Sequence, residues 1–127
     1  MQRVLYVGQD PDTVDYSDPA LPPGADAAKI RAGIDLAVRD LAARGWQVDT
    51  CMISPDGAGL RALSSQLTSA TYACVVIGGG MRIPPKSLLL FERVLNTVHQ
   101  AAPQARIAFN TRPEDTAEAA ARWVDAG

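Results

Sequence analysis

Short apolar runs alternate with longer segments of helical periodicity along the chain. Four runs rich in apolar and β-branched residues are predicted strands, at residues 3–8, 46–54, 72–78 and 105–110. Each is followed by a segment whose apolar residues recur at helical spacing. Such alternation is typical of βα units, so the pattern predicts an α/β fold built on a parallel sheet.

The first two predicted helices have recognisable boundaries. The first begins after Asp26, a favourable N-cap residue, and ends at Gly45, because glycine commonly follows the last helical turn. The second follows "PDGAG" and carries Leu60, Leu63 and Leu67 at helical spacing. Both helices therefore present one apolar stripe to the sheet.

The third and fourth predicted helices begin near prolines. The third is expected over residues 84–101, since proline in the first turn lacks only an N–H that would be unpaired anyway. The fourth is rich in alanine, opens at "TRPED" and ends with Trp123 and Val124. Thr111 and Glu114 have the spacing of a capping box at its start.

The composition of the strands predicts their order in the sheet. The third, "YACVVIG", is wholly apolar and should be central, whereas the second alternates polar and apolar residues and should lie at an edge. With right-handed crossovers, this favours a three-layer open sheet with strand order 2-1-3-4. The first helix would cover one face and the second and third the other. The last helix is expected to fold back onto the first face.

Composition and charge exclude several classes of protein. The chain has 127 residues, 47% of them hydrophobic, and is expected to form a single α/β domain over residues 1–127. Its formal charge of −2 and its scattered arginines argue against nucleic-acid binding. No apolar run is long enough to cross a membrane, and the N-terminus lacks a secretory pattern, so we expect no membrane contact and a cytoplasmic location.

The metal-binding residue types are sparse. Cys51 and Cys74 both fall in predicted strands without C-x-x-C spacing and are expected to be core thiols. The single histidine, His99, has no second histidine or neighbouring cysteine. No metal site is therefore predicted, and the sequence leaves the cofactor open.

Candidate binding residues cluster after the first, third and fourth strands. If strands one and three are neighbours, their connections leave in opposite directions and open a crevice where ligands of open α/β sheets bind. The loop over residues 9–25 is long enough to be a binding loop or lid, with Tyr16 and Asp18 as its candidates for ligand contact. The predicted ligand-binding residues are Gln9, Asp10, Tyr16, Gly78, Gly79, Gly80, Arg82, Asn110, Thr111 and Arg112.

Three interpretations of the "GGGMR" segment compete. A dinucleotide or P-loop site is not indicated, because the G-x-G-x-x-G and Walker patterns are missing. The glycine N–H groups could bind a phosphate or carboxylate together with Arg82 and Arg112. Alternatively, the glycines only allow close packing. The sequence leaves the last two open.

Catalysis has little support in the sequence. Asp10 and Asp12 could serve as acid and base or hold Mg²⁺, yet aspartates beside prolines also make turns and caps. Ser54 and Thr111 have no histidine nearby to activate them. An enzymatic function is therefore not predicted. It remains a minority hypothesis that rests on Asp10 and Asn110 alone.

The chain resembles a response-regulator receiver domain within the flavodoxin-like, Rossmann-like architecture. The similarity rests on "VLYVGQDPD", on "YACVVIGGGMRIPP" and on "AAPQARIAFNTR", which places Thr111 at the receiver's signalling threonine or serine. Gly78 stands at the phosphoacceptor position, Gln9 and Asp10 replace the paired acids, and the fifth strand with its lysine is missing. The resemblance therefore implies a receiver-like shape without phosphotransfer.

The third predicted helix suggests an oligomer. Its segment "LLLFERVLNTV" carries more apolar residues than one sheet face can bury, and the fourth strand would be an open edge. A homodimer through Leu89, Leu90, Val94 and the fourth strand would cover both, unless the C-terminal helix does so. The predicted function is binding of a small anionic ligand at the crevice. The alternative is a homodimeric, non-catalytic protein-interaction module.

Overall fold

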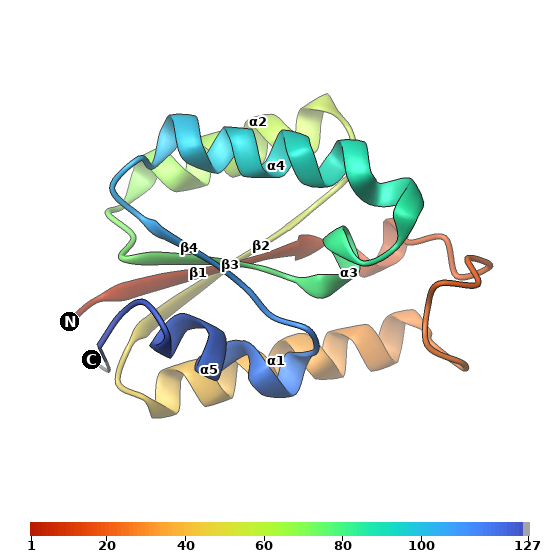
Figure 1. The fold of residues 1–127 in the computed structure, drawn as a ribbon, viewed down its shortest axis with the longest axis horizontal. Coiled ribbons are helices and arrows are strands. Elements are labelled where there is room, and N and C mark those ends of the chain that lie inside the picture. Colours follow the sequence, from red (N-terminus) through yellow and green to blue (C-terminus); the bar gives the residue numbers. More distant parts are fainter. Residues whose placement is uncertain (126–127) are drawn as a thin grey trace.

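A computed structural model describes residues 1–125 and contains a four-stranded, all-parallel sheet in the order β2-β1-β3-β4 (Figure 1). The strands are β1 (Arg3–Gln9), β2 (Gln47–Ile53), β3 (Cys74–Ile77) and β4 (Arg106–Phe109). The predicted α/β class and strand order are confirmed, and the arrangement is that of flavodoxin-like and Rossmann-like folds.

Helices cover both faces of the sheet, giving three layers (Figure 1). The helices α1 (Ala27–Ala43) and α5 (Thr116–Ala121) lie on one face, and α2 (Gly57–Ser69) and α4 (Leu88–Ala101) lie on the other. The last helix therefore folds back beside the first, as predicted, and its buried alanines pack in the same half of the core as α1.

The alternation of side chains along the strands divides the core into two halves. Val4 and Tyr6 of β1 face α1 and α5, whereas Leu5 and Val7 face α2 and α4. All four residues of β3 are buried, as expected for a central strand covered on both faces. Cys74 is buried in β3 and Cys51 is half-buried in β2, and both thiols are free.

The boundaries of α1 follow from its caps. The Asp26 side chain accepts a hydrogen bond from the Lys29 N–H at 2.8 Å. At the other end, Gly45 has φ +93°, a left-handed conformation that glycine adopts without strain. Both predicted ends of this helix are confirmed.

The region predicted as one helix over residues 84–101 is divided. A short helix α3 (Gly79–Arg82) and a 3₁₀ turn η2 (Pro85–Ser87) precede α4. Pro84 is extended, with ψ 126°, because the proline that follows it disfavours helical geometry in the preceding residue. The helix therefore starts later than predicted.

Two further 3₁₀ turns occur, η1 (Pro11–Thr13) after β1 and η3 (Pro113–Asp115) before α5. The η3 turn moves the capping interaction by one residue from the prediction. The Thr111 N–H donates to Asp115 Oδ1 at 2.9 Å, and the Thr111 hydroxyl bonds the other oxygen of the same carboxylate. The carboxylate that caps is thus Asp115 and not Glu114.

Within the described residues, no helix combines the length and apolar character needed to cross a membrane.

Candidate functional site

The carboxyl ends of β1 and β3 form a topological switch point. The two strands are adjacent and parallel. The chain leaves β1 toward α1 on one face, whereas it leaves β3 through α3 and η2 toward α4 on the opposite face (Figure 1). Ligands of open α/β sheets bind at such a divergence. The predicted adjacency of the two strands is confirmed.

A pocket of about 300 Å³ opens at this switch point, between the loop after β1 and the start of α4. Its charged wall consists of Asp15, Asp18, Lys86 and Arg93. Leu60, Leu89 and Leu90 contribute apolar surface from α2 and α4. The volume lies at the lower end of the range typical of small-molecule sites.

A smaller pocket of about 90 Å³ lies beside the first, on the α1 side. It is mostly apolar, with walls from Ile30, Ile34, Met52 and Met81. The two pockets share the wall residues Gln9, Val14, Leu21 and Gly80. The crevice therefore has a charged part and an apolar part that share these four lining residues.

The loop over residues 10–25 is ordered mainly by hydrogen bonds within itself. The Asp10 side chain accepts from the Asp12 N–H at 2.9 Å, and the Tyr16 hydroxyl donates to the Pro11 carbonyl at 2.6 Å. The Gln9 amide donates to the Thr13 carbonyl at 3.1 Å. Asp10 and Tyr16, both predicted to bind ligand, therefore support the fold of this loop and line neither crevice pocket. Asp10 instead lines a separate open pocket together with Arg31 and Asp35.

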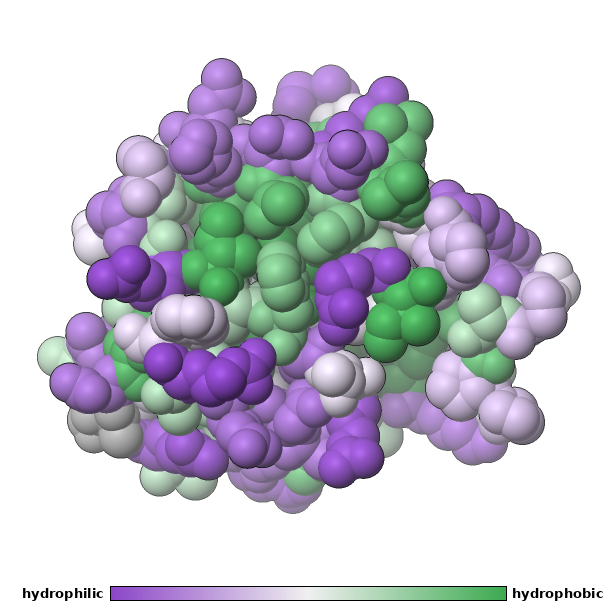
Figure 2. All heavy atoms as spheres, in the orientation of Figure 1, coloured by the Kyte–Doolittle hydropathy of each residue, from purple (hydrophilic) through white to green (hydrophobic). Residues whose placement is uncertain are grey.

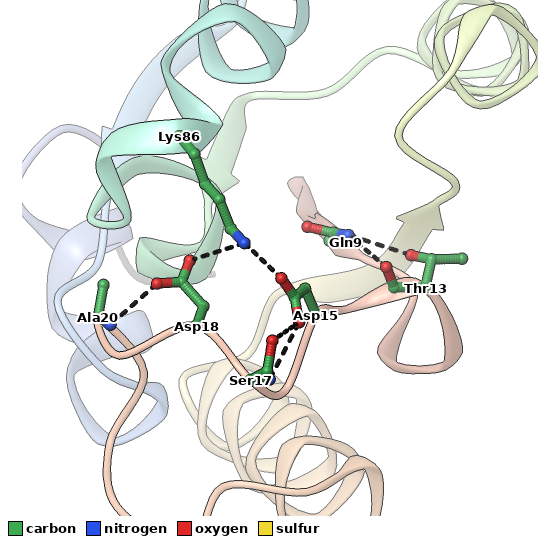
Figure 3. A network of polar contacts seen from close by, with 7 residues as sticks. All are labelled: Gln9, Thr13, Asp15, Ser17, Asp18, Ala20 and Lys86. Carbon is green, nitrogen blue, oxygen red and sulfur yellow. Dashed lines mark hydrogen bonds and ion pairs between the residues drawn. The ribbon is translucent and has the colours of Figure 1, made fainter.

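Lys86 joins this loop to the opposite side of the crevice (Figure 3). Its ammonium group hydrogen-bonds the Asp15 carboxylate and lies 3.7 Å from a carboxylate oxygen of Asp18. Asp15 also accepts from the N–H and hydroxyl of Ser17, and Asp18 accepts from the Ala20 N–H at 2.9 Å. The loop is thus tied to η2 by ion pairs across the mouth of the larger pocket.

The ion pair moves the pKa values of both partners further from neutral pH. The Lys86 hydrogen bond, assisted by Ser17, lowers the pKa of Asp15 to about 2. The same hydrogen bond raises the pKa of Lys86. General acids and bases work best with pKa values near the working pH. These two groups are therefore suited to binding charge and not to transferring protons in this arrangement.

Most groups predicted for an anion site behind the glycine step are bonded to the protein itself, although Arg82 Nε is buried without a hydrogen-bond partner among the described residues. The Gly79 N–H donates to Asn110 Oδ1 at 2.7 Å, and Arg82 Nη2 donates to the Asn110 carbonyl at 2.9 Å. The Arg82 guanidinium also lies 5.6 Å from the centre of the Phe109 ring. The packing interpretation of "GGGMR" therefore fits Gly79 and Arg82 better than the anion interpretation.

Asn110 is the centre of a buried polar network. Its amide nitrogen donates to Thr116 Oγ1 at 2.8 Å and to the Tyr6 hydroxyl at 3.2 Å. Burial raises the pKa of Tyr6, so this hydroxyl stays protonated. The network links β1, the turn after β3, β4 and α5, which gives Asn110 a structural function that the sequence did not reveal.

Thr111 and Arg112 are also outside the crevice. Thr111 is bonded to Asp115, as described above, and the exposed Arg112 guanidinium lies 3.7 Å from Glu114. Neither residue lines the two crevice pockets. That these two residues approach a ligand from the side stays a prediction, and in the structure η3 leads the chain from β4 to α5.

Part of the predicted site does reach the crevice. Gln9 and Gly80 line both pockets, Gly78 lines the smaller one, and Asp18 lines the larger one. Three residues of the larger pocket were not predicted from the sequence: Asp15, Lys86 and Arg93. The sequence features that could have indicated them are the acidic residues of the loop and the lysine that directly follows two prolines. Only the folded chain shows that these residues lie together in one pocket.

The residues predicted for a dimer interface differ in how accessible they are. Val94 lies on the buried side of α4 and is 0% exposed, so it is not accessible to a second copy. Leu89 and Leu90 line the crevice pocket instead. Leu89 is exposed and Val94 is not, so only part of the predicted helix face is accessible, and dimerisation through α4 stays a prediction. The fourth strand is an edge strand, as expected.

Within residues 1–125, no three or more histidine, cysteine, aspartate or glutamate side chains are grouped closely enough to hold a metal ion. Comparisons of the chain with family models, with curated proteins and with solved structures found no match.

Proposed function

We propose that the switch-point crevice binds a small ligand that carries one anionic group and one apolar group. The observation that carries this proposal is the joint position of Lys86 and Arg93 on the wall of the larger pocket, beside the smaller apolar pocket. The anionic group would lie between the two cations. The apolar group would extend past Gly80, where an added Cβ atom would meet no other atom within 4 Å.

The hydrogen bonding of the charged residues favours an anion over a cation. The carboxylates of Asp15 and Asp18 accept hydrogen bonds from Ser17 and Ala20 of their own loop. In the described part of the chain, Lys86 has only the carboxylates of Asp15 and Asp18 as partners, and no carboxylate is within ion-pair distance of Arg93. Unused donor capacity therefore lies on the cationic side of the pocket.

Ligand binding would change the contacts of the loop. An anion at Lys86 would compete with Asp15, because both need the same ammonium donors. The loop would then shift or be held by the ligand itself. This is a binding function, and the proposal contains no catalytic step.

Thermal unfolding at constant ionic strength tests the proposal. The probes are inorganic phosphate, adenosine monophosphate, benzoate and hexanoate, with hexanol and hexylamine as matched neutral and cationic controls. A probe present at about 100 times its Kd should stabilise the folded state by about 2.7 kcal/mol, whereas the alcohol and amine should not. No shift with any acid, or a shift with hexylamine alone, would contradict an anion site.

Variants locate the site. Lys86→Gln and Arg93→Gln should each weaken binding of the acid that gives the largest shift by about tenfold, since each removes a charge-assisted hydrogen bond. Arg112→Gln is the matched control, because this exposed arginine lies outside both crevice pockets. Equal losses in the three variants would indicate a nonspecific charge effect.

A second candidate is a receiver-like, non-catalytic interaction module without phosphotransfer. The observation that favours it is a group of exposed apolar side chains outside the crevice, with Ile83 at 52% exposure and Leu88 at 61%. This candidate gains support if none of the probes binds and if the chain forms a complex through that surface.

A further inference from the structure

The outer edge of β4 has an unusual combination of features for the end of a sheet. β4 pairs only with β3 within the described chain, and Figure 1 shows it at the front edge of the sheet. Figure 2 shows a band of apolar atoms on this face, framed by hydrophilic groups. The opposite edge strand, β2, carries Gln47, Asp49 and Thr50. Edge strands with apolar surroundings are prone to pair with another strand.

The apolar band has members from α4 as well as from the strand. Phe91 and Phe109 pack edge to face with ring centres 5.6 Å apart. Leu88 and Leu95 lie on the same side of α4 as Phe91 by helical spacing. The half-buried Ile107 projects from β4 toward the same face as Phe109.

The backbone groups of β4 restrict how another strand can pair. The Arg106 N–H donates to the Ala73 carbonyl, so the backbone of Arg106 and Ala108 points toward β3. Because successive residues alternate, the backbone of Ile107 and Phe109 points outward. The Phe109 carbonyl already accepts from Arg122 at 3.0 Å, and the Ala105 N–H already donates to Ala102. Within residues 1–125, Ile107 is thus the outward residue of β4 whose N–H and carbonyl both lack a partner.

We propose that this chain forms a two-fold homodimer in which two copies of β4 pair antiparallel about Ile107. The N–H and carbonyl of Ile107 would bond the carbonyl and N–H of the partner's Ile107. The Phe109 N–H would bond the carbonyl of the partner's Ala105. The two groups left over in this register, the Phe109 carbonyl and the Ala105 N–H, are those already satisfied within each chain.

The register explains why a second copy fits better than an unrelated strand. A two-fold axis through Ile107 makes each free group face its own complement, which is the condition for a closed isologous interface. An axis through Phe109 would bring together two carbonyls already bonded to Arg122. The side chains brought together on the α4 face are Ile107, Phe109 and Ala105, all apolar.

Disulfide trapping tests the register. In a hydrogen-bonded antiparallel pair the Cα atoms lie about 5.5 Å apart, within the range of roughly 4.4–6.8 Å that a disulfide spans. Ile107→Cys should therefore form a covalent dimer under mild oxidation. Arg106→Cys is the control, because it is more exposed but faces the partner's Ala108 instead of itself. Cys51 and Cys74 are present in both variants and give the same background.

A second pair of variants tests the surface without changing the strand. Leu88→Glu should weaken the dimer by about tenfold or more, because every dimer contains two copies of the change. Leu89→Glu should leave the oligomeric state unchanged, since this equally apolar neighbour is 57% exposed but lines the crevice instead. Light scattering after size exclusion, under reducing conditions and over a series of concentrations, gives the mass.

The expected result for the unmodified chain is a mass approaching twice 13.5 kDa as concentration rises. A monomeric mass at every concentration would overturn the proposal. So would equal cross-linking of the two cysteine variants, or a dimer broken by Leu89→Glu and not by Leu88→Glu. Circular dichroism of each variant separates loss of association from loss of folding.

Discussion

The backbone N–H of Gly79 donates to the side-chain oxygen of Asn110 at 2.7 Å, across 31 positions of sequence. This bond fixes the turn after β3 against the end of β4. It also removes the N–H of the second glycine from the set of groups that could bind an anion. The same asparagine then satisfies Tyr6 and Thr116 with its other end.

Replacing this asparagine should destabilise the fold. Asn110→Ala leaves the Gly79 N–H without an acceptor in a buried site, and we expect the free energy of unfolding to fall by about 2–3 kcal/mol. Chemical denaturation measures the change. Asn96→Ala is the control, because Asn96 is exposed and bonds only the Glu92 carbonyl of its own helix. Equal effects at both positions would show that the buried network contributes little.

The glycines of the step should differ in their tolerance of alanine. A Cβ at Gly79 would lie 3.2 Å from the Thr111 carbonyl oxygen and 3.3 Å from that of Asn110, and backbone atoms cannot move cheaply. We expect Gly79→Ala to cost about 1–2 kcal/mol of stability, and Gly80→Ala, which meets nothing within 4 Å, to change it by less than about 0.5 kcal/mol. Thermal or denaturant unfolding of the two variants measures the difference in stability. A neutral Gly79→Ala would mean that the turn can relax.

The loop contact should be lost in acid. Asp15 has an ordinary pKa of 3.8 that its partners lower to about 2 in the folded chain. A lowered pKa stabilises the folded state above 3.8, and this contribution disappears as the pH falls from there to about 2. Carbon NMR of the Asp15 carboxyl should show the low value, with concurrent shifts at Lys86.

Removing the cation provides the control for this titration. In Lys86→Met the pKa of Asp15 should rise part of the way back toward 3.8, since Ser17 still donates to the carboxylate. An unchanged titration would mean that Ser17 alone causes the shift.

The two thiols should react at different rates. Burial raises the pKa of Cys74 to about 12 and also raises the pKa of the half-buried Cys51. Iodoacetamide at mildly alkaline pH should modify Cys51 slowly and Cys74 only after unfolding by denaturant. Peptide mass spectrometry locates the label. Equal labelling of both thiols in the folded chain would show that β3 opens readily.

The alternation of patterns in the sequence was sufficient to predict the architecture. Apolar runs, helical stripes and caps such as Asp26 are local features, and right-handed connection leaves few ways to arrange four βα units. The wholly apolar third strand and the alternating second strand then decided which strand is central and which is at the edge.

The site could be predicted only in part. The sequence placed Gln9, Gly78 and Gly80 at the crevice because they lie at or just after the carboxyl ends of β1 and β3, and strand adjacency fixes where such residues lie. It placed Arg82, Thr111 and Arg112 there too, but their directions depend on where the chain turns after each strand. Those turns were set by Pro84 and by η3, whose effects on side-chain direction are not local.

The layered α/β body and the position of its switch point were therefore predictable from the chain, because both follow from periodicity and connection. Which charges face that point depends on the folded arrangement. Lys86 meets Asp15 from 71 positions away, and Asn110 accepts from Gly79 across the sheet end. Such partnerships depend on the distances between folded segments, and a linear pattern of residue types carries no record of those distances.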